Sequence, residues 1–132
     1  FAPACVAAAG LAVSEAFSLL RRDNACAGHR HLELSLWDPC EAVPASPPPV
    51  GNEIGDGVWL VGLGHLGQAY AWTLGFMEAP SQPIYLQDVD RAGASTVSTS
   101  MVTTIADVGR LKTRVVDAWL AQRGYESAAI RD

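Results

Sequence analysis

Residues 57–72 read GVWLVGLGHLGQAYAW, and they organise our interpretation of the whole chain. A short apolar run rich in β-forming residues passes directly into Gly-x-Gly-x-x-Gly and then into a helical pattern, as in the strand, turn and helix of a nucleotide-binding βαβ unit. Gly62 permits the tight turn, Gly64 lets backbone N–H groups approach a phosphate, and Gly67 lets the helix pack close to the sheet. We therefore expect a phosphate at the helix N-terminus, where free N–H groups and the helix dipole stabilise anions. A glycine-rich turn that binds nothing is disfavoured, because the strand before it and the helix after it are both present.

A second strand is predicted at residues 84–87, after a helix that Pro80 and Pro83 bring to an end. This strand finishes at Asp88, about 20 residues beyond the last glycine of the motif, where a carboxylate can accept hydrogen bonds from both ribose hydroxyls. Asp90 follows two residues later. The alternative for Asp88 is an ordinary turn or cap aspartate.

The N-terminal third predicts two further elements. Residues 4–22 are typical of a helix with Pro3 at its start, and residues 31–37 alternate strictly between apolar and polar, which predicts a half-buried strand. Residues 43–56 are rich in Pro and Gly and are interpreted as a linker. We therefore divide the chain into a helix-plus-strand segment (1–42), this linker, and a nucleotide-binding unit (57–132).

The C-terminal third predicts a second crossover helix. Asp107 is interpreted as its N-cap, apolar residues recur at helical spacing as far as Arg123, and Gly124 is expected just beyond its end. Lys112 lies early in this helix, near the expected phosphate site. A lone lysine on a helix is otherwise usually just a solvated charge.

Composition and charge restrict the possible partners and compartments. The chain has 132 residues, a formal net charge of -5 and three cysteines, which favour a single globular domain, argue against nucleic acid and suggest a reducing, cytoplasmic compartment. We expect no apolar stretch to reach the roughly 20 residues of a membrane span, so no membrane partner is predicted. A metal cluster of Cys26, His29 and His31 is disfavoured because no paired Cys-x-x-Cys is present. The chain begins at Phe1 rather than Met, so we expect it to be processed or part of something longer.

Three motifs in order resemble the ThiF-like family, which includes ubiquitin-activating enzymes and the enzymes that adenylate sulfur-carrier proteins. They are Asp-Val-Asp at 88–90, the Ser/Thr-rich residues 95–100, and Asp-Val-Gly-Arg-Leu-Lys at 107–112. With the glycine loop, the likeness covers about residues 57 to 124. It implies a Rossmann-like, three-layer α/β domain with a mainly parallel sheet, here preceded by the N-terminal helix and strand.

The resemblance also implies a function. Members of the family use ATP with magnesium to adenylate the C-terminus of a ubiquitin-like or sulfur-carrier protein, and they are dimers, so we expect a homodimer. Matched to the family's motifs, the nucleotide would be bound by residues of the glycine loop, the second strand and the last helix: Gly62, Gly64, His65, Gly67, Asp88, Asp90 and Lys112.

The chain departs from the family at several positions. Thr99 stands in place of an arginine that would neutralise phosphate charge, Thr96 in place of an asparagine, and His65 in place of a common glycine. No catalytic cysteine and no magnesium-holding aspartate downstream are recognised, so no catalytic residue is assigned, and the chain is interpreted as the N-terminal part of a divergent member. The alternatives are an NAD-binding oxidoreductase module, which the glycine loop and Asp88 support equally, and a non-catalytic scaffold.

Overall fold

The structure is a computed structural model that describes residues 1–40 and 51–130. The chain divides into two compact units, Phe1–Gly51 and Asn52–Asp132. Residues 43–50 of the expected linker lie outside the described ranges.

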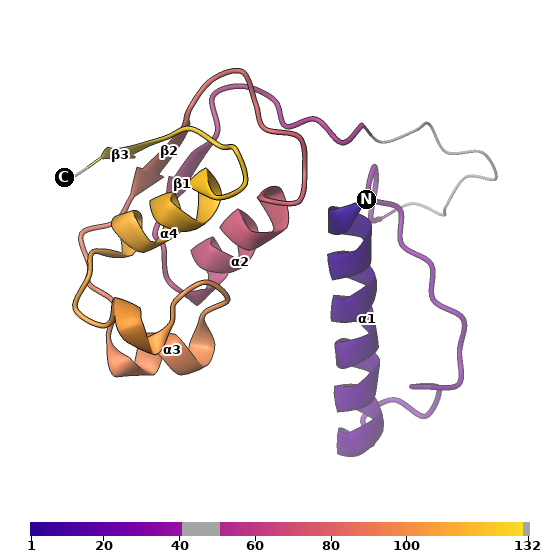
Figure 1. The fold of residues 1–132 in the computed structure, drawn as a ribbon. Coiled ribbons are helices and arrows are strands. Elements are labelled where there is room, and N and C mark those ends of the chain that lie inside the picture. The colour runs from indigo at the N-terminus through magenta and orange to yellow at the C-terminus, as the bar shows by residue number, and fades with distance from the viewer. Residues whose placement is uncertain (41–50, 131–132) are drawn as a thin grey trace. The chain divides into compact units, whose positions relative to one another are not determined.

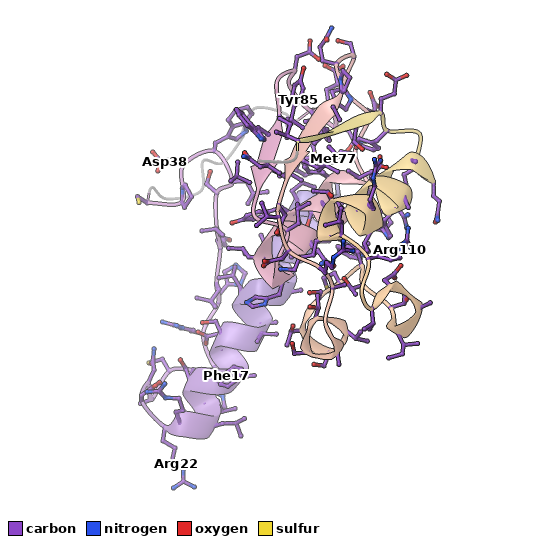
Figure 2. All side chains as sticks on the ribbon, turned by 90° about the vertical axis from the view of Figure 1, so that its left-hand side faces the viewer. Phe17, Arg22, Asp38, Met77, Tyr85 and Arg110 are labelled. Carbon is purple, nitrogen blue, oxygen red and sulfur yellow. The ribbon has the colours of Figure 1, made fainter. Side chains whose placement is uncertain are left out.

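The first unit contains one long helix, α1 (Ala2–Arg21), which confirms the predicted N-terminal helix (Figure 1). It ends at Arg22, which has a left-handed backbone with φ 59° and whose side chain projects beyond the helix (Figure 2). Glu15 on this helix accepts hydrogen bonds from the Arg30 guanidinium and from the Gly28 N–H group at 3.0 Å. The Arg30 hydrogen bond, followed by that of Gly28, lowers the pKa of Glu15. These contacts tie the turn after α1 to the helix.

The predicted strand at residues 31–37 is wrong. Within residues 31–40 the structure forms no strand, and the leucines expected to face inward, Leu32, Leu34 and Leu36, are 38–41% exposed. Alternation gives a segment two different faces, but a strand also needs a neighbour for its backbone hydrogen bonds. The described residues of the first unit contain no other strand that supplies one.

The expectation that no segment reaches membrane-spanning length also needs correction. Helix α1 is 20 residues long with a mean hydropathy of 1.6 in its most apolar window, so it is long and apolar enough to cross a bilayer. This statement concerns length and composition only, and a signal sequence or a helix in the core of a soluble protein passes the same test. The cytoplasmic location therefore stays a prediction.

The second unit contains a parallel sheet of three strands, β1 (Trp59–Val61), β2 (Ile84–Gln87) and β3 (Ser127–Ile130), in that order. Leu60 lies beside Leu86, and Leu86 beside Ala129. Helix α2 (His65–Leu74) forms the crossover between β1 and β2. This arrangement confirms the predicted parallel neighbours and the predicted α/β fold.

Helices α2 and α4 (Lys112–Ala121) pack on one face of this sheet (Figure 1). Between these helices and the sheet lies a core of fully or almost fully buried residues: Leu63, Ala71, Ile84, Leu86, Val116, Leu120 and Tyr125. Burial raises the pKa of Tyr125, whose hydroxyl donates to the backbone carbonyls of Leu74 and Met77. On the other face Trp59, Val61 and Tyr85 are exposed, so the described part of the unit supplies two of the three expected layers.

The last helix begins later than predicted, and Asp107 is not its N-cap. Asp107 ends a one-turn 3₁₀ helix (Ile105–Asp107), and its carboxylate accepts hydrogen bonds from the Thr104 hydroxyl at 2.7 Å and the Thr104 N–H group at 2.9 Å. These bonds and the Arg110 guanidinium lower the pKa of Asp107. The chain then turns at Val108 and Gly109, where Gly109 has φ +88°, and α4 starts at Lys112. The aspartate caps the nearer, shorter turn because its side chain reaches only locally.

Candidate nucleotide-binding site

The glycine loop has the geometry that its sequence predicts. Gly62 has φ +81°, a conformation that L side chains rarely adopt, and its N–H group donates to the Gln87 carbonyl at 2.8 Å. A Cβ at Gly67 would overlap the carbonyl oxygen of Gly62, whereas one at Gly64 would meet nothing within 4 Å. Gly67 therefore permits close packing of the helix, and the space in front of Gly64 is open. No side chain caps the start of α2, so its first N–H groups are available to an anion.

Asp88 ties the end of β2 to this loop. Its Oδ2 atom accepts a hydrogen bond from the Leu63 N–H group at 2.6 Å, and its Oδ1 atom accepts one from the Asp90 N–H group at 2.7 Å. The side chain is 8% exposed. Each carboxylate oxygen has two lone pairs, so each retains acceptor capacity beside its backbone partner.

Lys112 reaches the same carboxylates from α4. Its Nζ atom lies 2.8 Å from Asp90 Oδ2 and 3.9 Å from Asp88 Oδ2, and its side chain is only 12% exposed. Its position follows from the backbone, because the Ala92 N–H group donates to the Arg110 carbonyl at 2.8 Å and the Lys112 N–H group to the Asp90 carbonyl at 3.0 Å. The segment after β2 and the segment before α4 are thus joined, which places Lys112 at the carboxyl edge of the sheet.

A pocket of about 350 Å³ opens beside these groups. It is lined by Gly64, His65, Ser95, Thr96, Thr99, Ser100 and Lys112. The hydroxyls come largely from helix α3 (Ala94–Thr99), where Thr96 Oγ1 accepts the Gly93 N–H bond and Thr99 Oγ1 donates to the Ser95 carbonyl, both at 3.0 Å. Ser100 Oγ is buried and has no hydrogen-bond partner within the described structure.

The structure therefore brings the predicted residues together at one end of the sheet. The pocket is lined by Gly64, His65 and Lys112, and Lys112 in turn contacts Asp88 and Asp90. The adjoining turn is shaped by Gly62 and Gly67. The expected residues are therefore neighbours. Their contact with a nucleotide stays a prediction.

Sequence analysis missed Gln68, which holds two parts of the site together. This side chain is fully buried; its Nε2 atom donates to the Leu63 carbonyl at 3.1 Å, and its Oε1 atom accepts bonds from the Thr103 hydroxyl at 2.9 Å and N–H group at 3.1 Å. A glutamine on an amphipathic helix is usually exposed, so periodicity gave no signal. The only sequence signal was its place directly after the third glycine of the motif.

A second hollow lies away from this pocket. An apolar hollow of about 430 Å³ lies along the exposed edge of the sheet, with Trp59, Leu66 and Tyr70 in its lining. Within residues 1–40 and 51–130, no three His, Cys, Asp or Glu side chains gather where they could hold a metal ion. The lining of the apolar hollow does not include Asp88 or Lys112.

Comparison with known proteins identifies the family. The model of the BilD C-terminal domain matches residues 54–131, and that of the BilD N-terminal domain matches residues 1–36. This chain belongs to the BilD family. The bacterial E1-like protein BilD of Collimonas sp. (strain OK412) is 40% identical over 124 residues, which are 89% of this chain and 27% of that protein. The chain thus spans about a quarter of the length of the curated relative that it matches.

A solved structure supports the α/β fold of this chain. The microcin C7 biosynthetic enzyme MccB, in a complex with N-formylated MccA, covers 61% of the BilD-family chain with a TM-score of 0.52 and 22% identity, over 23% of its own length. E. coli MccB with ATP covers 57% of the chain at 24% identity, over 22% of its own length, with a TM-score of 0.48. The BilD relative is an E1-like protein, which confirms the expected relationship to E1-like proteins, whereas the domain models that match are those of BilD rather than ThiF itself.

Proposed function

We propose that this chain binds an adenine nucleotide, ATP with magnesium, in the pocket between the glycine loop and Lys112. The proposed reaction context is that of E1-like proteins, adenylation of the C-terminus of a ubiquitin-like or sulfur-carrier partner. The observation that carries the proposal is the Asp88 carboxylate, which holds the glycine loop through Leu63 and lies 3.9 Å from Lys112. One carboxylate thus links the ribose end and the phosphate end of the expected ligand.

The carboxyl edge of the parallel sheet supports this placement of the nucleotide. Ligands of open α/β sheets bind outside the carboxyl ends of the strands, beside the loop that starts the first helix. Asp88 follows β2 directly, so its free lone pairs suit the ribose hydroxyls. The open space at Gly64, the start of α2 and Lys112 suit the phosphates. The E1-like relative favours ATP over NAD at this site.

The carboxylates of this site would bind magnesium only together with the phosphates of the nucleotide. Magnesium is usually held by one or two carboxylates together with substrate phosphates, and it keeps several waters. Asp90 is 66% exposed and Asp88 is 8% exposed, so Asp90 is the carboxylate that a phosphate-bound magnesium ion would meet. Bound magnesium would neutralise phosphate charge at this edge.

Isothermal titration calorimetry with ATP plus magnesium, and separately with NAD, tests the proposal on the 132-residue chain. We expect Asp88→Ala to weaken ATP binding by about 1–3 kcal/mol, because charge-assisted hydrogen bonds to the ribose are lost. The matched control is Asp56→Ala, since Asp56 precedes β1 at the opposite edge and contacts Ser81 at 2.9 Å. Absence of ATP binding by the native chain, or equal effects of both variants, would contradict the assignment.

Lys112→Ala provides the second arm. Removal of this ammonium group should weaken ATP more than AMP, because ATP places more negative charge beside it. Tighter binding of NAD than of ATP would favour the oxidoreductase module instead.

A further inference from the structure

The positive charge of the pocket is paired with carboxylates of the same chain. Lys112 Nζ lies 2.8 Å from Asp90 Oδ2 and 3.9 Å from Asp88 Oδ2, with only 12% of its side chain exposed. Two carboxylates therefore face one ammonium group. The cluster is net negative before any nucleotide arrives.

The rest of the pocket offers hydrogen-bond donors rather than positive charge. Lys112 is the only lysine or arginine among the described residues that line it. Thr99, which stands where the resemblance expects an arginine, already donates its hydroxyl to the Ser95 carbonyl at 3.0 Å. Ser100 lines the pocket, but its Oγ atom is buried without a partner in the described structure, so the hydroxyl contacts a ligand only if the side chain rotates.

These donors match one phosphate group better than three. The start of α2 provides backbone N–H groups, and Lys112 provides one positive charge that it shares with Asp90. A monophosphate needs little more than this, whereas a triphosphate brings extra negative charge toward two carboxylates. Nearby like charges are unfavourable, the more so where access of water is limited.

We propose that this pocket discriminates between adenine nucleotides by their phosphate charge. The Asp90 carboxylate pairs with Lys112 and so limits the phosphate charge that Lys112 can neutralise. AMP, or the AMP part of an adenylate, binds without metal, whereas ATP binds well only when magnesium offsets its charge. The inference rests on the proposed nucleotide site and adds which ligands that site prefers.

Calorimetry on the full chain tests the proposal with AMP and with ATP, each in EDTA and in excess magnesium. In EDTA we expect AMP to bind about twofold to fivefold more tightly than ATP, the size of effect typical of a partly exposed charge pair. Magnesium should strengthen ATP binding and leave AMP binding nearly unchanged. High salt should shrink the difference between AMP and ATP in EDTA, because screening weakens exposed charges.

The decisive variant is Asp90→Asn, which removes the carboxylate charge and frees Lys112. Asp90 is 66% exposed and its N–H group, not its side chain, bonds to Asp88, so the fold should tolerate the change. In EDTA this variant should gain ATP affinity by about twofold to fivefold and AMP affinity much less. The control Glu126→Gln makes the same charge change before β3, at the opposite edge of the sheet, and should leave both affinities unchanged.

The outcomes separate the two proposals. Binding of ATP in EDTA as tight as that of AMP, or an Asp90→Asn variant that behaves like Glu126→Gln, would overturn the charge discrimination and leave the nucleotide site in place. Absence of binding by every nucleotide would overturn the site, and the discrimination with it.

Discussion

Replacement of Gln68 by leucine should destabilise the second unit strongly, although both side chains are similar in size. The wild-type side chain is fully buried and joins the carbonyl of Leu63 to the N–H groups of Val102 and Thr103 and to the Thr103 hydroxyl, at 2.9–3.3 Å. Leucine would leave these groups without partners in a place that water does not reach. Each unsatisfied buried group costs about 1–3 kcal/mol, but the bond to Val102 is long and some groups will relax. We therefore expect a loss of about 3–5 kcal/mol.

Urea denaturation of the wild-type and variant chains measures this loss. The exposed Gln82 offers a matched control, because Gln82→Leu makes the same chemical change and should alter stability by less than about 0.5 kcal/mol. A second variant, Gln68→Glu, tests the role of the Nε2 donor. A buried carboxylate facing the Leu63 carbonyl would favour its protonated form, so its folded pKa should be raised.

The sign of the pH dependence follows from that raised pKa. Gln68→Glu should be closest to wild-type stability below the ordinary glutamate pKa, and it should lose stability as pH rises through the raised value. If Gln68→Leu costs less than about 1 kcal/mol and Gln68→Glu follows the wild type at every pH, the tether is unimportant and the reasoning is refuted.

Three further predictions concern the loops of the site. Gly67→Ala should lower the unfolding midpoint sharply, because its Cβ would overlap the Gly62 carbonyl. Gly64→Ala should leave the midpoint nearly unchanged and weaken nucleotide binding. Equal midpoints for the two variants would contradict this reasoning. Because the folded pKa of Asp107 is lowered, its contribution to stability is complete above its unfolded pKa and is lost as pH falls through the folded value. Asp107→Asn should therefore reduce the loss of stability in acid by about 1 kcal/mol. Urea titrations of both chains at several pH values measure this difference. Pyrophosphate exchange with labelled ATP and candidate carrier proteins should be absent for this chain, since Thr99 provides no cation to stabilise charge on the transferring phosphoryl groups; clear exchange would refute the claim.

The parts of the fold that the sequence predicted are those in which local pattern and required geometry coincide. The strand before Gly62, the turn and the helix after it are all encoded within residues 57–72, and β2 was predicted with its observed bounds. The strand expected at 31–37 failed because pairing depends on a partner elsewhere in the chain. The start of α4 was misplaced because Asp107 binds locally to Thr104, a choice that helical spacing does not reveal.

The site was predicted as separate residues, but not as a network. Motif spacing identified Asp88, Asp90 and Lys112 individually, and nothing in the sequence indicated that Lys112 would be held by Asp90 at 2.8 Å. That contact depends on backbone bonds between residues 92 and 110, which are distant in sequence. Gln68 was missed for the same reason, since its partners at 102 and 103 are distant in sequence.

The same backbone bonds couple nucleotide binding to the order of both loops. Asp88 holds Leu63 in the glycine loop, and Lys112 is positioned through Asp90 and the Ala92–Arg110 bond, so a ligand that engages Asp88 and Lys112 draws on both segments. A ligand that binds only the native state raises stability in proportion to the logarithm of its concentration over Kd. The thermal midpoint should therefore rise more with AMP than with ATP in EDTA, and Asp90→Asn should reverse or abolish that order. A midpoint insensitive to either nucleotide at concentrations far above the calorimetric Kd would show that the nucleotide binds the unfolded chain as well as the native one, which would refute a site built from these folded segments.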